Sequence, residues 1–140
     1  MRLDEATCRR LVQGAAVARL ATTGADQLPH LVPVTFAITG DTVIIGIDQK
    51  PKTTTRLRRL RNLAENPRAA LLCDHYEEDW TRLWWVRLDG TATVITEGPE
   101  RVAPVAALVR KYPQYRDDPP AGPVIMITVE RWTGWSGAPG

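Results

Sequence analysis

Apolar residues along this 140-residue chain gather in short runs, which alternate with polar residues or end at turn signals. Runs of this length, rich in Val, Ile, Thr and aromatic residues and bounded by Gly, Pro or Asp, predict β-strands. Six strands are expected, at residues 16–22, 29–38, 42–47, 68–73, 83–96 and 124–129. Helical segments are inserted singly and do not alternate with the strands. The pattern therefore favours a mainly β, antiparallel barrel over a parallel α/β sheet.

Three segments instead carry apolar residues at helical spacing. The first begins at Asp4, a good N-cap residue, and its expected inner face comprises Thr7, Cys8, Leu11, Val12 and Ala15. The third is expected to open at residues 97–100 and to end before Pro113, with Val102, Val105, Ala106 and Val109 facing inward. Within the long strand, Gly90 indicates a bulge or a close backbone approach.

The second helical segment, residues 50–67, is strongly basic. A single acid, Glu65, stands against Lys50, Lys52, Arg56, Arg58, Arg59 and Arg61. Threonines at 53–55 can cap the helix, and Asn66–Pro67 ends it because a residue before proline avoids the helical region. A helix start with free N–H groups, hydroxyls and guanidinium groups suits a phosphate or carboxylate ligand. A solvated basic surface explains the same composition equally well.

Charge and composition narrow the possible functions. The formal net charge is only +2, so the positive charge of residues 50–67 is local and favours a compact anionic ligand over nucleic acid. The length fits a single domain spanning residues 1–140. No apolar run approaches a membrane span and the N-terminus lacks the core of a signal peptide, so we expect a cytoplasmic protein without a membrane partner. Cys8 and Cys73 fit no metal or redox spacing, and no metal site is expected.

Several of these segments occur together, in this order, in a known family. Residues 29–36 (Pro-His-Leu-Val-Pro-Val-Thr-Phe), residues 58–63 (Arg-Arg-Leu-Arg-Asn-Leu) with Asn66–Pro67, and residues 86–92 (Val-Arg-Leu-Asp-Gly-Thr-Ala) resemble the pyridoxamine-phosphate-oxidase-like flavin-binding split barrels. The loop at 74–80 and the strand at 83–87 are similar to the actinobacterial branch that uses the deazaflavin coenzyme F420. The resemblance implies a six-stranded antiparallel split barrel with flanking helices. It also implies a homodimer with two cofactor sites at the subunit interface.

The resemblance also implies which residues hold the cofactor. In the family, a basic helix start written roughly Ser-Arg-Lys-x-x-Asn-Leu binds phosphate, and here Leu57 stands in place of the serine. The implied phosphate ligands are Lys52, Thr53, Thr54, Arg58, Arg59 and Arg61. The implied ring contacts are the backbone of His30, Leu31, Val32, Pro33 and Val34, then Ile47 and Asp48, the loop residues Tyr76 and Trp80, and Trp135 in the tail.

The function implied is an F420-dependent oxidoreductase that transfers a hydride between the deazaflavin and a small conjugated or aromatic substrate. A sequence without a visible catalytic dyad fits a cofactor that carries out the redox chemistry itself. The number of basic residues exceeds the need of one phosphate and suits the F420 tail, which carries a phosphodiester and several carboxylates. FMN is the alternative cofactor, in a reductase or oxidase of the same fold. A non-catalytic flavin-, deazaflavin- or haem-binding protein is the alternative of another class.

Individual polar residues admit both a functional and a structural interpretation. Tyr76 and His30 are the two candidates for a proton donor, although the simpler interpretation of His30 is that it flanks the cofactor through its backbone alone. His75 lies among acids in the 74–79 loop, but the spacing is not that of a metal site and a solvated loop is the simpler interpretation.

The tryptophans are expected to serve either the core or the site. Trp84 and Trp85 are neighbours on a strand, so one side chain should enter the core while the other faces a pocket or an interface. Arg87 shares the face of Trp85. Trp132 and Trp135 lie where the resemblance implies that the tail passes over the partner's site.

Overall fold

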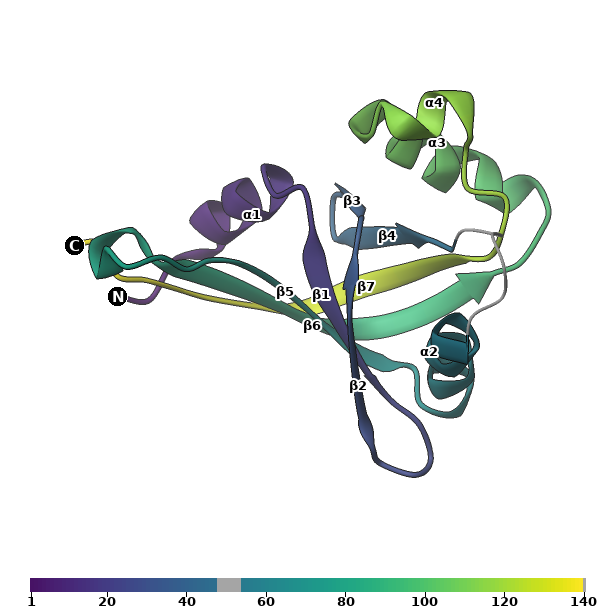
Figure 1. Cartoon of the computed structure of the whole chain (residues 1–140), viewed down its shortest axis with the longest axis horizontal. Helices are drawn as coiled ribbons and strands as arrows, with labels where there is room; N and C mark the ends of the chain where they lie inside the picture. Colours follow the sequence, from purple (N-terminus) through teal and green to yellow (C-terminus); the bar gives the residue numbers. More distant parts are fainter. Residues whose placement is uncertain (48–53, 140) are drawn as a thin grey trace.

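A computed structural model describes residues 1–47 and 54–139, with the backbone alone for residues 54–57. All its strands belong to one antiparallel sheet in the order β2-β1-β5-β6-β7-β4-β3, strongly curled and flanked by helices (Figure 1). The predicted fold class is therefore confirmed. The strands are β1 (Ala18–Thr23), β2 (Pro29–Val34), β3 (Ala37–Thr39), β4 (Thr42–Gly46), β5 (Arg68–His75), β6 (Trp84–Ile95) and β7 (Val124–Ser136). The helices are α1 (Glu5–Gln13), α2 (Thr54–Glu65), α3 (Val102–Lys111) and α4 (Gln114–Asp117), with short 3₁₀ turns η1 (Trp80–Arg82) and η2 (Pro99–Arg101).

The prediction of six strands is wrong by one, because the run at 29–38 divides into β2 and β3. These two are the edge strands of the sheet, at opposite ends of the strand order. Only Thr35 and Phe36 separate them, so three Cα–Cα steps, about 11 Å in all, join one edge to the other. A connection this short requires the sheet to curl until its edges approach, which gives the barrel its shape.

Side chains from α3 and α4 hold this junction. The Tyr112 hydroxyl accepts from the Phe36 amide at 2.9 Å and lies 2.8 Å from the Phe36 carbonyl oxygen. The Lys111 ammonium donates to the same carbonyl oxygen at 2.8 Å, and the Tyr115 hydroxyl lies 3.0 Å from Thr35 Oγ1. Phe36 itself is fully buried in the core. The junction of the two sheet edges is therefore fixed by one apolar anchor and a set of hydrogen bonds.

The apolar core has two parts. The main one fills the barrel and includes Val12, Leu20, Phe36, Val43, Ile45, Leu71, Val86, Leu88, Ile125 and Ile127. A smaller one lies between α3 and the β3–β4 hairpin and comprises Ala37, Ile44, Ala107, Leu108 and Val124. The predicted inner face of the third helix is only partly right: Val105 packs against this smaller core, but Val102 is 69% exposed, and the buried residues are Pro104, Ala107 and Leu108. This helix is apolar on most sides, so its spacing alone could not select the buried face.

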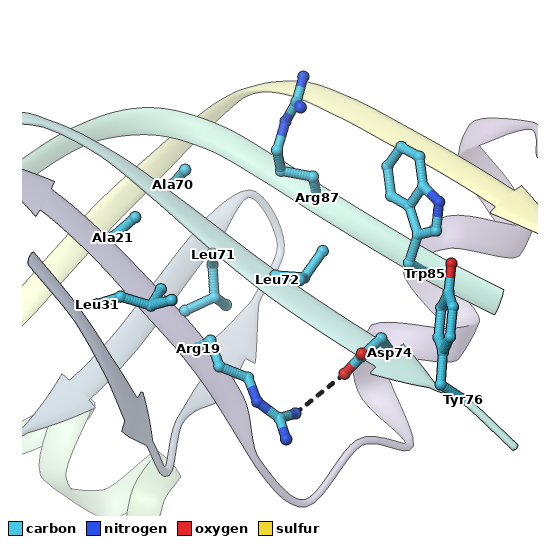
Figure 2. Close-up of a pocket in the computed structure, with 10 residues that line it drawn as sticks. All are labelled: Arg19, Ala21, Leu31, Ala70, Leu71, Leu72, Asp74, Tyr76, Trp85 and Arg87. Carbon is cyan, nitrogen blue, oxygen red and sulfur yellow. Dashed lines mark hydrogen bonds and ion pairs between the residues drawn. The ribbon is translucent and has the colours of Figure 1, made fainter. Parts of the chain in front are cut away.

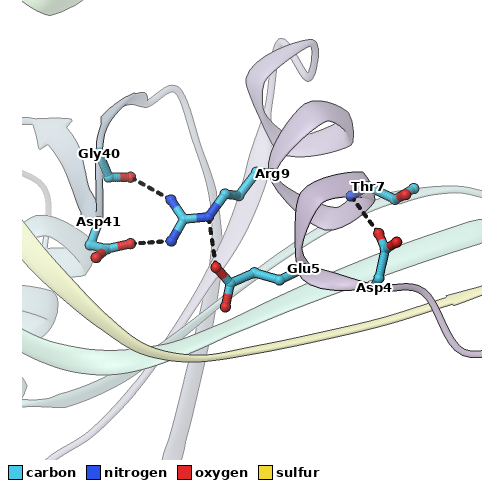
Figure 3. Close-up of polar contacts among 6 residues, drawn as sticks. All are labelled: Asp4, Glu5, Thr7, Arg9, Gly40 and Asp41. Carbon is cyan, nitrogen blue, oxygen red and sulfur yellow. Dashed lines mark hydrogen bonds and ion pairs between the residues drawn. The ribbon is translucent and has the colours of Figure 1, made fainter.

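The N-terminal helix α1 packs against the main core through Cys8 and Val12. As predicted, Asp4 caps it, and its carboxylate accepts from the Thr7 amide at 2.8 Å. Arg9 ties the helix to the β3–β4 turn through the Asp41 carboxylate and the Gly40 carbonyl, and also pairs with Glu5 (Figure 3). The guanidinium lies 4.7 Å from the centre of the Trp132 ring, so the same arginine covers β7.

The long strands β6 and β7 pair along most of their length. Their register shifts at Asp89/Gly90, as the sequence predicts, and a Cβ at Gly90 would lie 2.2 Å from the Thr128 carbonyl oxygen. β7 continues to Ser136, well beyond the predicted end at 129, because residues 131–136 pair with β6 on one side. The N-terminal residues Met1 and Leu3 bond to its other side. The polar residues 130 and 131 hide this continuation in the sequence.

Candidate functional site

The edge strand β2 separates two different environments. Its residue pairing with β1 places His30 opposite Thr22 and Leu31 opposite Ala21. Paired residues share a face of a sheet and successive residues alternate. His30 and Thr22 therefore face the side covered by α2, whereas Leu31 and Ala21 face the outside of the barrel. The edge of β2 itself pairs with no other strand of the described residues.

A buried polar contact fixes α2 against β1. The Asn62 side chain is 1% exposed and donates to the Thr22 hydroxyl at 3.2 Å. One turn later, Glu65 accepts from the Ala25 amide at 3.0 Å. Gly24 lies in contact with both, since a Cβ there would lie within 2.7 Å of Asn62 Oδ1 and of Glu65 Oε1. The helix ends where predicted, before Asn66–Pro67, so its later turns have a fixed position beside β2.

This docking brings Arg58 and Arg59 close to His30. Burial lowers the pKa of the His30 imidazole, and the positive charges of Arg59 and Arg58 lower it further. Its Nδ1 atom is buried and makes no hydrogen bond within the described residues. Arg58 Nη1 lies 3.8 Å from an Asp26 carboxylate oxygen. These effects favour the neutral form of the imidazole beside a positively charged helix.

On the outer face of the sheet, strands β1, β2, β5 and β6 form an open hollow of about 500 Å³. Its floor is largely apolar, and Tyr76 and Trp85 stand at one end (Figure 2). Arg19 pairs with Asp74 at 3.0 Å, and Arg87 pairs with Asp89 at 3.0 Å. We call this the outer hollow; it is lined by Arg19, Ala21, Leu31, Ala70, Leu71, Leu72, Asp74, Tyr76, Trp85 and Arg87.

The predicted ring contacts are distributed around β2. Leu31 and Tyr76 both line the outer hollow, at opposite ends of it, and are 67% and 61% exposed (Figure 2). Val34 is buried on the inner face, Val32 is half-buried there, and Pro33 is exposed opposite Arg19.

The remaining predicted contacts lie at the ends of strands or outside the described chain. Trp80 is 76% exposed in η1, and Trp135 pairs across strands with Trp85 at the end of the outer hollow. Ile47 is buried in the main core, and its amide donates to the Pro123 carbonyl oxygen at 2.9 Å. Arg61 is exposed on α2. Asp48, Lys52 and Thr53 lie outside the described residues, as does the side chain of Thr54.

Some residues of the outer hollow were not among the sequence predictions. Arg19, Ala21, Ala70, Leu72 and Asp74 come from β1 and β5, which pair side by side although they are far apart in the chain. Alternation along each strand would have placed the residues of that strand on one face. Only the pairing of β1 with β5 reveals that these two faces form one continuous surface. Trp84 packs on the core and Trp85 faces the outer hollow, which confirms that the two rings point to opposite sides.

The titratable residues give little sign of acid–base or metal chemistry. Burial raises the pKa of the Cys73 thiol to about 12, and burial also raises the pKa of Cys8. Both thiols are buried and free, so neither supplies a thiolate near neutrality. His75 contacts the Glu77 carboxylate through its ring nitrogen, and Arg82 pairs with the same carboxylate. Among residues 1–47 and 54–139, no cluster of three or more His, Cys, Asp or Glu is arranged to hold a metal.

Comparison with protein families gives one match. The family model described as pyridoxamine 5'-phosphate oxidase matches residues 4–136. A search of curated proteins found no significant match. None of the helices in the described part of the chain is long and apolar enough to cross a membrane.

Solved structures with the same fold include proteins that differ in what they bind. A conserved hypothetical protein from Mycobacterium tuberculosis aligns with a TM-score of 0.76 at 21% identity, over 96% of this chain and 86% of the other. A FAD-binding protein from Mesorhizobium loti aligns with a TM-score of 0.75 at 17% identity, over 96% and 95% of the two chains. A haem storage protein from Vibrio cholerae aligns with a TM-score of 0.72 at 17% identity, over 97% and 95%. At these identities the similarity establishes the fold.

Proposed function

Because the chain belongs to the pyridoxamine 5'-phosphate oxidase family, whose model matches residues 4–136, we propose that it is an oxidoreductase that uses a flavin-type cofactor, specifically the deazaflavin F420. The observation that carries the proposal is the meeting of two complementary surfaces at one sheet edge. The arginines of α2 lie on one side of β2, and the largely apolar outer hollow lies on its other side. A cofactor with an anionic tail and a planar ring needs both.

The described part of α2 fits the anionic end. Arg58 and Arg59 bring two positive charges beside a buried imidazole nitrogen that has no hydrogen-bond partner within the described residues. Guanidinium groups form strong, directional hydrogen bonds with phosphate and carboxylate oxygens. We assign phosphate binding to Arg58 and Arg59. Arg61, exposed on the same helix, and Thr54, Thr53 and Lys52, of which the last two precede the helix in the sequence, complete the proposed set.

The edge of β2 and the outer hollow suit the ring. An edge strand offers backbone N–H and C=O groups that no neighbouring strand uses, and a ring with heteroatoms along one side can bind them. We propose that the backbone of His30 to Val34 supplies this edge, and that the ring also approaches Ile47 and Asp48. Tyr76 adds aromatic surface at one end of the hollow, where flat rings are favoured, and we propose Trp80 and Trp135 as further contacts of the ring.

We further propose that two copies of the chain pair over the outer hollow. Leu31 and Tyr76 line it and are both more than half exposed, and large exposed apolar side chains gathered in one hollow are typical of an interaction surface. A second copy placed there would bury these side chains and close the hollow to water. The homodimer would then carry two cofactor sites, each between the copies.

When bound, F420 would supply two-electron hydride transfer to a small conjugated or aromatic substrate. The residues of this chain would bind and orient the cofactor and exclude water. Tyr76 is the better placed proton donor, since its hydroxyl lines the outer hollow, whereas His30 faces the α2 side. FMN is the alternative cofactor, because its single phosphate would use the same arginines.

One observation favours a second candidate, a haem-binding protein without redox turnover. Tyr76 is exposed at the hollow and His75 is its neighbour, and tyrosine and histidine are both axial ligands of haem iron. The fold also occurs in the haem storage protein from Vibrio cholerae.

Titration of the purified protein separates these functions. The five tryptophans allow binding of F420, FMN and haem to be followed by quenching of intrinsic fluorescence. The proposal predicts micromolar or tighter F420 binding, much weaker FMN binding, and turnover of reduced F420 with at least one compound from a panel of enones, quinones and nitroaromatics. Preferential binding of FMN would replace the cofactor assignment. Preferential binding of haem, or F420 binding without turnover of any of these compounds, would contradict the enzyme assignment.

A further inference from the structure

A second recess lies between α3 and the β3–β4 hairpin. Figure 1 shows α3 above β3 and β4, on a different part of the molecule from α2. Two hollows, of about 260 and 240 Å³, adjoin there and share Thr39, Ala107 and Arg110 as lining residues. We call the pair the α3 groove.

One end of the α3 groove is positively charged. Arg110 and Lys111 line it together with the amide side chain of Gln13 at the end of α1. Arg110 is exposed and forms no ion pair with any residue of the described chain. Lys111 donates to the Phe36 carbonyl oxygen at 2.8 Å and lies 3.8 Å from the centre of the Phe36 ring, and burial lowers its pKa. An ammonium has three donors, so this contact leaves hydrogen-bonding capacity on a half-buried cation.

Among the described residues, no acid lines the groove to balance these charges. The lining of both hollows contains neither Asp nor Glu. Asp41, two residues beyond Thr39, is the nearest acid along the β3–β4 turn, and Arg9 binds it from the other side (Figure 3). The groove therefore has an excess of positive charge that an anion from solution would neutralise.

The other end of the groove is apolar. Ile44, Ala103, Pro104 and Met126 line it, and Thr42 is the polar side chain at its margin. Arg110 and Ala107 lie between the two ends, since they line both hollows. A ligand that spans both hollows could thus place a charged group at one end of the groove and an apolar group at the other.

We propose that the α3 groove is a second ligand site, for a small organic carboxylate with an apolar tail. The carboxylate of the ligand lies against Arg110 and Lys111, and its apolar tail lies against Pro104 and Met126. This site is independent of the cofactor site, because it shares no residue with the outer hollow or with α2.

Nuclear magnetic resonance titration of the full chain with sodium hexanoate tests the proposal. We expect saturable shifts at the amides of Thr39, Ala107 and Met126, and no saturable shift at Leu31 or Tyr76 in the outer hollow. Hexan-1-ol keeps the tail and acetate keeps the charge, and each should bind at least fivefold more weakly than hexanoate. Equal binding of hexanol, or shifts that sodium chloride reproduces at the same ionic strength, would overturn the proposal.

A pair of variants isolates the charge. Arg110→Gln should weaken hexanoate binding at least fivefold without unfolding the protein, since the side chain is exposed and forms no ion pair within the described residues. Arg116→Gln removes an exposed arginine from α4, outside both hollows, and should leave the affinity unchanged. Equal affinities of the two variants would show that Arg110 does not bind the carboxylate, and the site would be rejected.

Discussion

The imidazole of His30 reports the electrostatic state of the proposed phosphate site. Its pKa is lowered by burial and by the positive charges of Arg59 and Arg58, while its buried Nδ1 makes no hydrogen bond within the described residues. An anion bound to the two arginines would offset their charge and favour the imidazolium. This single residue therefore senses whether an anion is present, without needing to take part in any reaction.

We predict that FMN raises the pKa of His30 and that riboflavin, which lacks the phosphate, does not. By linkage, protonation of His30 must favour the anion by the same factor, so phosphate-dependent affinity should increase as pH falls through this pKa. Proton resonance of the ring in a His75→Gln variant measures it directly, because the chain has only two histidines. An unchanged or lowered pKa at saturating FMN would place the phosphate elsewhere.

At the scale of the element, the buried hydrogen bond between Asn62 and Thr22 helps to fix the position of α2. Asn62→Ala would leave the Thr22 hydroxyl buried without its donor, at a cost of roughly 1–3 kcal/mol in the free energy of unfolding. Arg61→Ala, exposed on the same helix, should change that free energy by no more than about 0.5 kcal/mol. Urea denaturation measures both, and equal stabilities of the two variants would show that Asn62 does not anchor the helix.

The pairing of β6 with β7 depends on the absence of a side chain at Gly90. Gly90→Ala would place a Cβ 2.2 Å from the Thr128 carbonyl oxygen, and because that atom belongs to the backbone it cannot move aside cheaply. We expect a loss of about 3 kcal/mol or more in unfolding free energy. Gly14→Ala is the control: its Cβ would make only ordinary contacts, and its stability should stay within about 1 kcal/mol of the wild type. A Gly90→Ala protein as stable as this control would contradict the register of the two strands.

How well the sequence predicts a helix or strand depends on how clearly its apolar residues are confined to one face. The Asp4 cap, the Gly90 bulge and the end of α2 before Pro67 follow from local patterns, and the structure confirms them. Most strands follow as well, but the division of residues 29–38 into β2 and β3 and the continuation of β7 to Ser136 do not. The buried face of α3 does not, because that helix is apolar on most sides and only packing against Ile44 and Val124 selects Ala107 and Leu108.

The sequence predicts the candidate site only in part, for a related reason. Local composition marks the arginines of α2 only as a candidate anion site. The outer hollow, however, forms where β1 and β5 pair across about fifty residues of sequence, so Arg19 and Asp74 meet only once the sheet is built. Strand pairing over this distance leaves no local signal, and the closing of the barrel through Thr35 and Phe36 is equally a property of the complete sheet.

At the scale of the whole molecule, the exposed apolar residues of the outer hollow predict self-association. We expect wild-type protein to sediment with twice the mass of one chain, and Leu31→Asp to shift it to the monomer by placing a charge in the proposed interface. Leu28→Asp adds the same charge at a similarly exposed leucine in the turn before β2, outside the hollow, and should leave the dimer intact. A monomeric wild type, or a dimeric Leu31→Asp variant, would exclude this interface.

The central claim is that α2 holds the anionic part of the cofactor. The F420 affinity of an Arg59 variant tests this claim most directly. The affinity of F420 should be compared between Arg59→Ala and Arg116→Ala, the latter removing an exposed arginine of α4. Loss of a hydrogen bond to a charged group costs about 1.5–3 kcal/mol, so Arg59→Ala should bind F420 roughly 10- to 150-fold more weakly. Arg116→Ala should match the wild type. If Arg59→Ala remains folded and binds F420 as tightly as Arg116→Ala does, the arginines of α2 are ordinary surface and the cofactor site lies elsewhere.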